Sequence, residues 1–409
     1  MVKTFNNDEP LPINFVDVEF DHPVYILFSS GTTGIPKCIV HGAGGTLLQH
    51  KKELILHCDL SNKDKLFYYT TCGWMMWNWM VSTLSTGASL VTFDGSPGFP
   101  TMEALWHLIE SEKITVFGTS PKYIQACMNK DIHPQNNHNL ESLRTILSTG
   151  APLLPEHYSW VYQNVKSNLH LASISGGTDI ISCFMLGNPV LPVRLGEIQC
   201  AGLGMAVEAW NNPGKNLQGT KAELVCTRPF ASMPIGFWND KENKKYSAAY
   251  FEHFTSHTVW RHGDFIEATP NGGFIIHGRS DSTLNPGGVR IGTAEIYRQV
   301  ENLIEIEDSL AVGKPVNGDV EIILFVKLAE GSMLDQDLIN KIKSEIKTNL
   351  TPRHVPAKII AIDGIPYTRS GKKVETAILK ILQGESVPNL SAIANSEVLQ
   401  QYNKISQTL

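Results

Sequence analysis

Short apolar runs rich in β-branched and aromatic residues alternate with helix-length segments from about Val24 to Leu186. The two clearest helix-length segments span 101–111 and 121–130, and Pro121 stands where a first helical turn tolerates proline. This alternation is typical of βαβ units, which bury a parallel sheet between helices. The sequence therefore predicts an α/β fold whose strands are Val24–Phe28, Leu66–Tyr69, Leu90–Phe93, Ile114–Phe117 and Thr145–Ser148.

The pattern changes twice further along the 409-residue chain, which is long enough for two to three domains at about 150 residues each. Strands punctuated by Gly and Pro, such as 222–226 and 273–277, predict a β-rich subdomain at about 199–278. From 281 onward the pattern predicts a small α+β domain with helices at 293–302 and 334–350 and strands at 321–328 and 358–362. The longer helix carries one apolar stripe, Leu338, Ile342, Ile346 and Leu350.

These changes predict two domains, 1–280 and 281–409. The stretch from about Gly384 is polar, and we expect it to fray.

Composition narrows the classes of function. Lys and Arg number 34 against 40 Asp and Glu, a net charge of −6, and the absence of a long basic run argues against a nucleic-acid partner. The seven cysteines are widely spaced and form no C-x-x-C, which argues against a disulfide framework or a zinc ribbon. No apolar stretch is long enough to cross a membrane. We therefore expect a cytosolic protein, and its oligomeric state stays open.

A loop rich in hydroxyls follows the first apolar run: Ser29-Ser30-Gly31-Thr32-Thr33-Gly34-Ile35-Pro36-Lys37. Two glycines relax its backbone, four hydroxyls donate hydrogen bonds and one lysine supplies charge, so the loop can wrap a triphosphate. It is not a Walker A sequence, which needs glycine directly before the lysine and a hydroxyl after it. A Ser/Thr-rich turn is the alternative reading, and the preceding strand and terminal lysine favour the phosphate loop.

Four more motifs follow along the chain. Each has a plainer reading when taken alone, as a tight turn, a surface hairpin or a solvated lysine. They are Ser175-Gly176-Gly177-Thr178-Asp179, Trp260-Arg261-His262-Gly263-Asp264, Gly278-Arg279-Ser280-Asp281 with Asn285-Pro286-Gly287-Gly288-Val289-Arg290-Ile291, and Pro366-Tyr367-Thr368-Arg369-Ser370-Gly371-Lys372.

Together, and in this order, the five motifs resemble those of the adenylate-forming superfamily of acyl-CoA synthetases, luciferases and adenylation domains. The resemblance implies a large domain with a parallel α/β sheet and a β-rich subdomain, followed by a small mobile α+β domain. It also implies a reaction in two steps, in which a carboxylate attacks the α-phosphate of ATP and coenzyme A then displaces AMP. ATP, Mg²⁺ and coenzyme A are the implied requirements, and positioning and charge neutralisation replace a protein nucleophile.

The resemblance also implies residue roles. Lys372 is the implied catalytic residue, Asp281 the hinge between domains, and Asp179 a metal ligand whose reach is one methylene shorter than the glutamate usual in the family. The implied nucleotide- and phosphate-binding residues are Ser29, Ser30, Gly31, Thr32, Thr33, Gly34, Lys37, Gly150, Thr178, Asp264, Arg279 and Arg290.

A second group of residues indicates which carboxylic acid would be the substrate. Thr70-Thr71-Cys72-Gly73-Trp74-Met75-Met76-Trp77 resembles a segment of the superfamily branch that activates acetate, so Trp74 is expected in the acyl pocket. That branch has tryptophans where this chain has Ser175 and Gly176, and the smaller residues are expected to admit a larger acid. The resemblance is to ligases that convert acetoacetate and coenzyme A to acetoacetyl-CoA, with AMP and pyrophosphate as products. A ligase for another short-chain acid is the alternative.

Only 28 residues precede Ser29, fewer than in other members of the superfamily. The sequence therefore leads us to expect an N-terminally truncated form with an incomplete large domain. Strand edges and apolar faces are expected to be exposed. A truncated, non-catalytic isoform is the corresponding alternative function.

Overall fold

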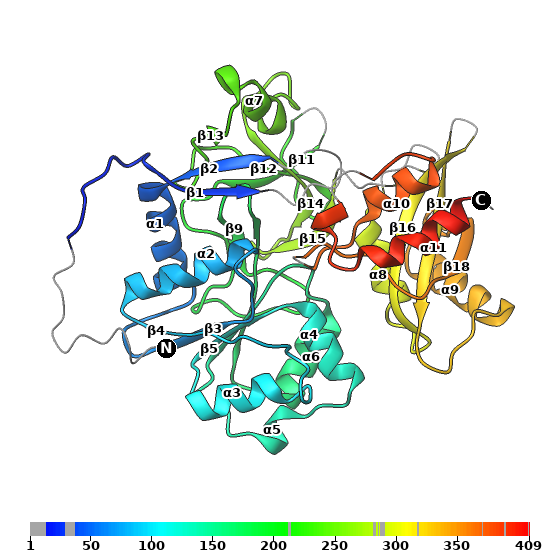
Figure 1. Ribbon diagram of the computed structural model, residues 1–409, viewed down its shortest axis with the longest axis horizontal. Coiled ribbons are helices and arrows are strands. Elements are labelled where there is room, and N and C mark those ends of the chain that lie inside the picture. The colour runs from blue at the N-terminus through cyan, green and yellow to red at the C-terminus, as the bar shows by residue number, and fades with distance from the viewer. Residues whose placement is uncertain are drawn as a thin grey trace.

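The computed structural model describes residues 14–28, 37–211, 214–280, 284, 286, 291–316, 319–369, 371–387, 390–407 and 409, apart from the side chains of Arg279 and Asp319. Figure 1 shows a larger N-terminal body, coloured blue to green, and a smaller C-terminal body, coloured yellow to red. The larger body contains the predicted parallel sheet.

Five parallel strands form that sheet, in the order β4-β3-β5-β6-β7. Four of the predicted strands are present, Thr145–Ser148 with the predicted bounds and the other three with shifted ends. The strands are β3 (Lys65–Tyr68), β4 (Ser89–Val91), β5 (Val116–Thr119), β6 (Thr145–Ser148) and β7 (His170–Ser173). The predicted α/β class is confirmed.

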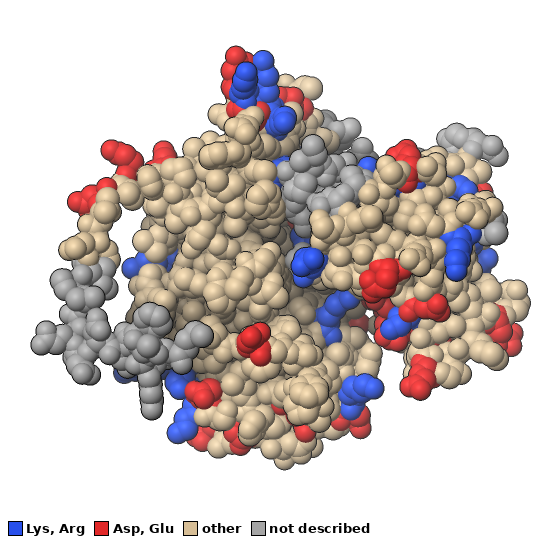
Figure 2. Space-filling model, viewed as in Figure 1, with Lys and Arg blue, Asp and Glu red and all other residues tan. Residues whose placement is uncertain are grey.

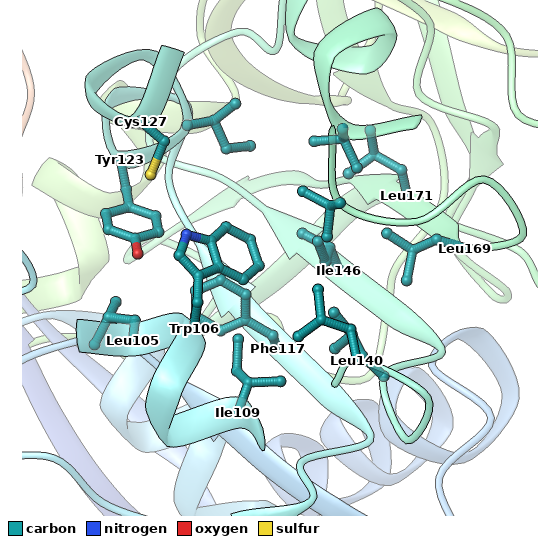
Figure 3. Close-up of a cluster of buried hydrophobic side chains, with 14 of the residues drawn as sticks. Leu105, Trp106, Ile109, Phe117, Tyr123, Cys127, Leu140, Ile146, Leu169 and Leu171 are labelled. Carbon is teal, nitrogen blue, oxygen red and sulfur yellow. The ribbon is translucent and has the colours of Figure 1, made fainter. Parts of the chain in front are cut away.

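Helices cover both faces of the sheet. On one face, Leu105, Trp106 and Ile109 of α3 point toward Phe117 and Tyr123 in the buried cluster of Figure 3. Burial of such large side chains supplies much of the driving force for packing a helix on a sheet. The helices of this face are α3 (Ala104–Glu112), α4 (Pro121–Asn129), α5 (Pro134–Asn137) and α6 (Pro155–Asn164).

The second face is packed by α1 (Ala43–Lys52), the π-helix η2 (Glu53–His57), α2 (Met75–Val81) and η3 (Ser82–Thr86). Here Glu53 is fully buried. It accepts hydrogen bonds from Trp79 Nε1 at 2.8 Å, Gln49 Nε2 at 2.8 Å and the Cys183 backbone N–H at 3.1 Å. Three donors satisfy a carboxylate that would otherwise be costly to bury.

The fifth predicted strand was placed wrongly. Residues 24–28 belong to β1 (Pro23–Phe28), which pairs antiparallel with β2 (Cys38–Gly42) in the separate sheet β1-β2-β13. Val24, Ile26 and Phe28 are all exposed on this edge strand. A continuous apolar run predicts burial on both faces, but here only Tyr25 and Leu27 pack against a buried cluster, and the face with Val24, Ile26 and Phe28 is exposed. The expectation of an exposed apolar face holds at β1.

Antiparallel strands follow the parallel sheet. One sheet has the order β10-β9-β8, from β8 (Ser175–Gly177), β9 (Ser182–Leu186) and β10 (Cys200–Ala201). Another has the order β11-β12-β14-β15 and contains the two strands predicted at 222–226 and 273–277. Its strands are β11 (Val207–Trp210), β12 (Ala222–Cys226), β14 (Trp260–Ala268) and β15 (Phe274–Arg279), and between them lie β13 (Gly236–Phe237), η4 (Lys241–Asn243) and α7 (Lys244–Tyr250).

The C-terminal body has the predicted α+β composition. Its sheet has the order β16-β17-β18, with β16 antiparallel and β18 parallel to β17. Leu338, Ile342 and Ile346 of α9 are buried on it, as the apolar stripe predicts. The elements are α8 (Thr293–Val300), β16 (Ile306–Val316), β17 (Asp319–Leu328), α9 (Gln336–Asn349), η6 (Pro352–His354), β18 (Lys358–Ala361), α10 (Glu375–Leu382), η7 (Leu390–Ala392), η8 (Ser396–Val398) and α11 (Leu399–Ser406).

The expectation that the chain frays from about Gly384 was wrong. Helix α11 packs on the C-terminal sheet through Leu399 and Tyr402, and the Tyr402 ring lies 4.9 Å from that of Phe325. Two apolar anchors are enough to dock a helix whose other residues are polar, and a composition average conceals them.

No buried cluster among the described residues contains side chains from both sides of position 280. This separation supports the predicted boundary at 280/281, which stays a prediction. No helix in the described part of the chain has the length and apolar character needed to span a bilayer. Figure 2 shows charged residues of both signs mixed over the visible face, including the tip at α7, where Lys244 Nζ lies 2.9 Å from Glu242 Oε2.

We predict that Tyr402→Ala destabilises the C-terminal domain by about 3–5 kcal/mol, because it removes a fully buried ring. It also removes the hydrogen bond that Tyr402 donates to the Gly364 carbonyl at 3.1 Å. Urea unfolding followed by circular dichroism measures the loss. Lys404→Ala on the same helix is the control and should change stability by less than about 0.5 kcal/mol. Equal effects of the two variants would contradict the packing of α11.

Candidate active site

The predicted acyl-pocket residues Trp74 and Ser175, together with Gly150, all follow strands of the parallel sheet. Trp74 comes after β3, Gly150 after β6 and Ser175 after β7. Parallel strands end at the same edge of their sheet, and the carboxyl edge is where open α/β sheets bind ligands. The structure therefore brings these three positions to one edge.

Trp74 and Gly150 are neighbours at that edge. Gly150 has φ +98°, a conformation that favours glycine, and a Cβ built there would lie 3.7 Å from the Trp74 ring. The indole packs edge-to-face against Tyr68, with ring centroids 6.2 Å apart. Thr149 Oγ1 donates to the Ile174 carbonyl at 2.8 Å and ties the segment after β6 to the segment after β7. Trp74 thus has a fixed position beside the backbone of Gly150.

Lys37 and Asp179, which lie 142 positions apart in the chain, meet in an ion pair. Lys37 Nζ lies 2.8 Å from Asp179 Oδ1. Tyr250 of α7 donates its hydroxyl to the same oxygen, and Lys37 Nζ lies 4.7 Å from the centre of the Tyr250 ring. Among the described residues both hydrogen bonds end on Oδ1. The end of the predicted phosphate loop and the predicted metal ligand therefore share one cluster.

The charge of Asp179 is held by its neighbours. Burial disfavours the ionised carboxylate, but the charges of Lys37 and His262 and the hydrogen bonds from Lys37 and Tyr250 outweigh burial. Together they hold the pKa of Asp179 well below its usual range. Asp179 is therefore an anion throughout the physiological pH range and can bind a cation.

Two histidines and a tyrosine were missed as site residues. His41 Nε2 lies 3.0 Å from the Thr178 carbonyl, and burial lowers the pKa of His41 to about 4, which keeps the ring neutral. His262 packs on Phe184 with ring centroids 4.7 Å apart. The string 260–264 contains His262, but its sequence gives no reason to prefer that residue. Tyr250 carries no sequence signal, because only the fold of α7 brings it to Asp179.

Asp264, predicted to bind ribose, lies in β14, where it pairs with Arg279 of β15. Its Oδ2 lies 3.7 Å from His262 Nε2. A second carboxylate, Glu223, lies on the neighbouring strand β12, with Oε1 2.8 Å from Ser280 Oγ and 3.1 Å from Arg261 Nε. The residues that lead into the predicted hinge are thus anchored to a polar network in the antiparallel sheet.

The role expected of Gly176 does not fit the structure. A Cβ built at this position would lie 1.9 Å from the Ser182 carbonyl oxygen and 2.6 Å from Cys183 Cα. The missing side chain therefore permits two strands to approach closely and opens no room for a larger acid. Gly177 differs, because a Cβ there would meet only the His262 ring, at 3.5 Å.

Lys372 lies on an exposed tight turn of the C-terminal domain. Thr368 N–H donates to the Lys372 carbonyl at 2.8 Å, the Lys372 N–H donates to Thr368 Oγ1 at 3.0 Å, and Gly371 has φ +79°. The described contacts of Asp179 do not include Lys372. The structure therefore fixes the turn that carries Lys372 and does not bring this lysine to Asp179.

The same turn is anchored at its start. Tyr367 donates its hydroxyl to Asp308 Oδ2 at 2.6 Å, and Lys122 of α4 lies over the Tyr367 ring. Burial lowers the pKa of Lys122 to about 8, against the charge of Asp308. A second contact between the two bodies joins Lys221 to Glu295. These pairs dock the C-terminal domain on the N-terminal body.

Several predicted site residues lie outside the described part of the chain. They are Ser29, Ser30, Gly31, Thr32, Thr33, Gly34, Asp281 and Arg290, and for Arg279 only the backbone is described. Their roles stay predictions.

Residues 3–230 match the family model described as AMP-binding enzyme. The chain belongs to the AMP-binding enzyme family. The predicted membership of the adenylate-forming superfamily is thereby confirmed, and the matched range contains the first two of the five motifs.

Several curated and solved relatives are acetoacetyl-CoA synthetases. The acetoacetyl-coenzyme A synthetase of Rhizobium meliloti (strain 1021) is 56% identical over 388 residues, which cover 95% of this chain and 59% of that protein. The mouse protein (Mus musculus) is 51% identical over 97% of this chain and 59% of its own length. The solved acetoacetyl-CoA synthetase of Streptomyces lividans superposes with a TM-score of 0.92 at 44% identity, covering 99% of this chain and 62% of that one. This chain thus spans about three fifths of the length of these relatives.

We predict that Asp179→Asn lowers the free energy of unfolding at pH 7 by about 1.5–3 kcal/mol, because a charged acceptor of two hydrogen bonds is lost. Folding lowers the pKa of Asp179, so its contribution is complete above the ordinary value of 3.8 and is lost only as pH falls below it. Urea unfolding should therefore give the same difference at about pH 5 as at pH 7. Glu242→Gln, at an exposed ion pair of η4 and α7, is the control and should cost at most about 1 kcal/mol. A difference that vanishes at pH 5 would contradict the lowered pKa.

We predict that Gly176→Ala destabilises the chain by about 1–3 kcal/mol, because its methyl group collides with the backbone of Ser182. Gly177→Ala is the matched control and should cost less. Thermal unfolding measures both. In activity assays with acetoacetate and acetate, Gly176→Ala should lower both rates together. A selective loss with acetoacetate would restore Gly176 to the acyl pocket.

Proposed function

We propose that this chain carries the nucleotide site and catalytic lysine of an ATP-dependent acid-thiol ligase that converts acetoacetate and coenzyme A to acetoacetyl-CoA. The reaction passes through an acyl-adenylate and releases AMP and pyrophosphate. The observation that carries the proposal is the TM-score of 0.92 to an acetoacetyl-CoA synthetase over 99% of this chain. We infer the acid from the names of the relatives, and we infer the chemistry from the residues of this chain.

In the first step the acid's carboxylate oxygen bonds to the α-phosphorus of ATP, and the bond to the pyrophosphate oxygen breaks. Two anions must approach, so cations are the main requirement of the site. Lys37, with Ser29, Ser30, Gly31, Thr32, Thr33 and Gly34, would hold the phosphates, and Asp264, Arg279 and Arg290 would hold the ribose and neighbouring phosphate. Thr178 and Gly150 would bind the nucleotide at the carboxyl edge of the sheet.

Mg²⁺ fits the chemistry of Asp179. Magnesium prefers oxygen ligands, and Asp179 is ionised with both of its described hydrogen bonds on Oδ1. Asp179 would hold the ion beside the phosphates through Oδ2. When bound, Mg²⁺ would neutralise charge on ATP. Tyr250 and Lys37 would keep the carboxylate of Asp179 in position with or without the ion.

The acyl group would lie against Trp74, between the segments after β3 and β7, with Ser175 at the start of β8. Trp74 and Ser175, rather than Gly176, would then select acetoacetate. Asp281 would be the hinge about which the C-terminal domain turns between the two steps, so that Lys372 serves adenylation and another face serves coenzyme A. A cytosolic location fits these small, diffusible substrates.

The purified chain tests the proposal directly. With ATP, Mg²⁺ and coenzyme A, acetoacetate should give AMP, pyrophosphate and acetoacetyl-CoA in equal amounts, and should be preferred over acetate, propionate and butyrate. If the chain preferred another acid, acetoacetate would be the wrong substrate, but the assignment to the acid-thiol ligases would stand. Absence of pyrophosphate release with every acid would overturn the ligase activity of this chain.

We predict that Lys372→Ala lowers acetoacetate-dependent pyrophosphate release by about 10²- to 10³-fold or more, because one cation serves the charge that develops during adenylation. Thioester formation from pre-made acetoacetyl-adenylate should be largely spared. Lys347→Ala, at an exposed lysine of α9, is the control and should leave both steps unchanged. Equal loss of the two steps would show that Lys372 does not act in adenylation.

A further inference from the structure

A group of metal-ligating side chains lies on α3, in a part of the N-terminal body that the proposed ligase reaction does not use. One nitrogen or oxygen atom from each of His107, Glu110 and His138 lies within 4.8 Å of the corresponding atoms of the other two. It is the one such group of three or more found among the described residues. Figure 1 places α3 and α5 at the end of this body opposite α7, which carries Tyr250.

The helix presents its ligands on the face turned away from the core. Leu105, Trp106 and Ile109 point into the buried cluster of Figure 3. Positions 107 and 110 are three residues apart and therefore neighbours on one helix face. Glu103 precedes His107 by four residues and adds a second carboxylate to the same face. The packed side of α3 thus fixes the direction of three donors.

The third ligand comes from the segment between α5 and β6. His138 follows α5 directly, and Leu140, two residues later, is buried in the same core cluster as Trp106. Asn137 Nδ2 donates to Glu103 Oε1 at 2.6 Å, and the Asn139 backbone N–H donates to Glu110 Oε1 at 3.0 Å. The segment is therefore held against α3 on both sides of His138.

His138 itself has an unused donor atom. Its side chain is only 9% exposed, and Nδ1 lies 3.1 Å from Glu110 Oε2. Nε2 is buried and has no hydrogen-bond partner, and the nearest carboxylate oxygen, Glu103 Oε1, lies 3.9 Å away, beyond hydrogen-bonding distance. A buried imidazole nitrogen without a partner is costly, and a metal ion would satisfy it.

We propose that His107, Glu110 and His138 bind one Zn²⁺ ion, with a water molecule as the fourth ligand and Glu103 as an outer partner. Two imidazoles and a carboxylate are a donor set that zinc accepts in tetrahedral sites, whereas Mg²⁺ and Ca²⁺ prefer oxygen ligands alone. Zinc–ligand bonds are about 2.0–2.2 Å long, so small side-chain rotations would bring the three donors into range. The ion would link α3 to the segment before β6.

Titration of the metal-stripped chain with zinc, measured by isothermal titration calorimetry, tests the site. We expect one ion per chain, and Co²⁺ in its place should give the visible absorption of tetrahedral coordination. His107→Gln and His138→Gln should each weaken binding by more than about 100-fold, and Glu103→Gln by about 10-fold, since loss of a ligand costs more than loss of an outer partner. His107 is exposed, so its variant keeps the test valid if His138→Gln does not fold.

His133→Gln is the matched control. This histidine lies at the start of α5, whereas His138 lies at its end; it pairs with Asp131 and is outside the group. Binding should be unchanged in this variant, and zinc should raise the thermal midpoint of the wild type and of His133→Gln but not that of His107→Gln. Absence of zinc binding, or binding equally weakened by His133→Gln, would overturn the proposal. Because calorimetry and unfolding need no ligase activity, the result is independent of the function proposed above.

Discussion

Five parallel strands end at one edge of a sheet, and the position of the candidate active site depends on that constraint. Connections between parallel strands return over the faces of the sheet, so every carboxyl end opens onto the same edge. Trp74, Gly150 and Ser175 come from three stretches of chain and reach this edge because β3, β6 and β7 deliver them there. The buried cluster around Trp106 and Phe117 holds the sheet and helices in register.

One buried charge organises the neighbouring antiparallel part. Asp179 accepts hydrogen bonds from Lys37 and Tyr250, which belong to distant segments. Burial by itself would raise the pKa of Asp179, and the charges of Lys37 and His262 with the hydrogen bonds from Lys37 and Tyr250 lower it instead, so these distant segments stabilise the buried carboxylate as an anion. In the proposed reaction, Lys37 and Asp179 would exchange this pairing for contacts with a polyphosphate and its cation. Glu53 joins Trp79 of α2 to the backbone of Cys183 in β9, and burial raises its pKa, whereas the pKa of Asp179 is lowered.

Polar contacts of Lys122, Lys221 and Arg298 join the C-terminal body to the N-terminal body. Lys122 lies over Tyr367, Lys221 pairs with Glu295, and the buried clusters of the two bodies do not merge among the described residues. Interfaces of this kind permit relative motion of domains, because little apolar area must be exposed when they open. The motion of Lys372 with its domain, as proposed for the change between the two steps, would therefore break mainly polar contacts.

The sequence by itself determined the alternation of strands and helices, the order of the five motifs and the apolar stripe of α9, because these follow from local spacing and side-chain chemistry. It led correctly to the family, and it singled out Lys37 and Asp179, which the structure joins in an ion pair. Only the tertiary structure decided that β1 pairs outside the parallel sheet and that α11 docks through Tyr402. The same holds for Gly176, which serves a close strand contact, and for Tyr250 and His41, which complete the surroundings of Asp179 and Thr178. Each of these facts depends on contacts between residues that are far apart in the chain. Local sequence patterns do not specify such contacts.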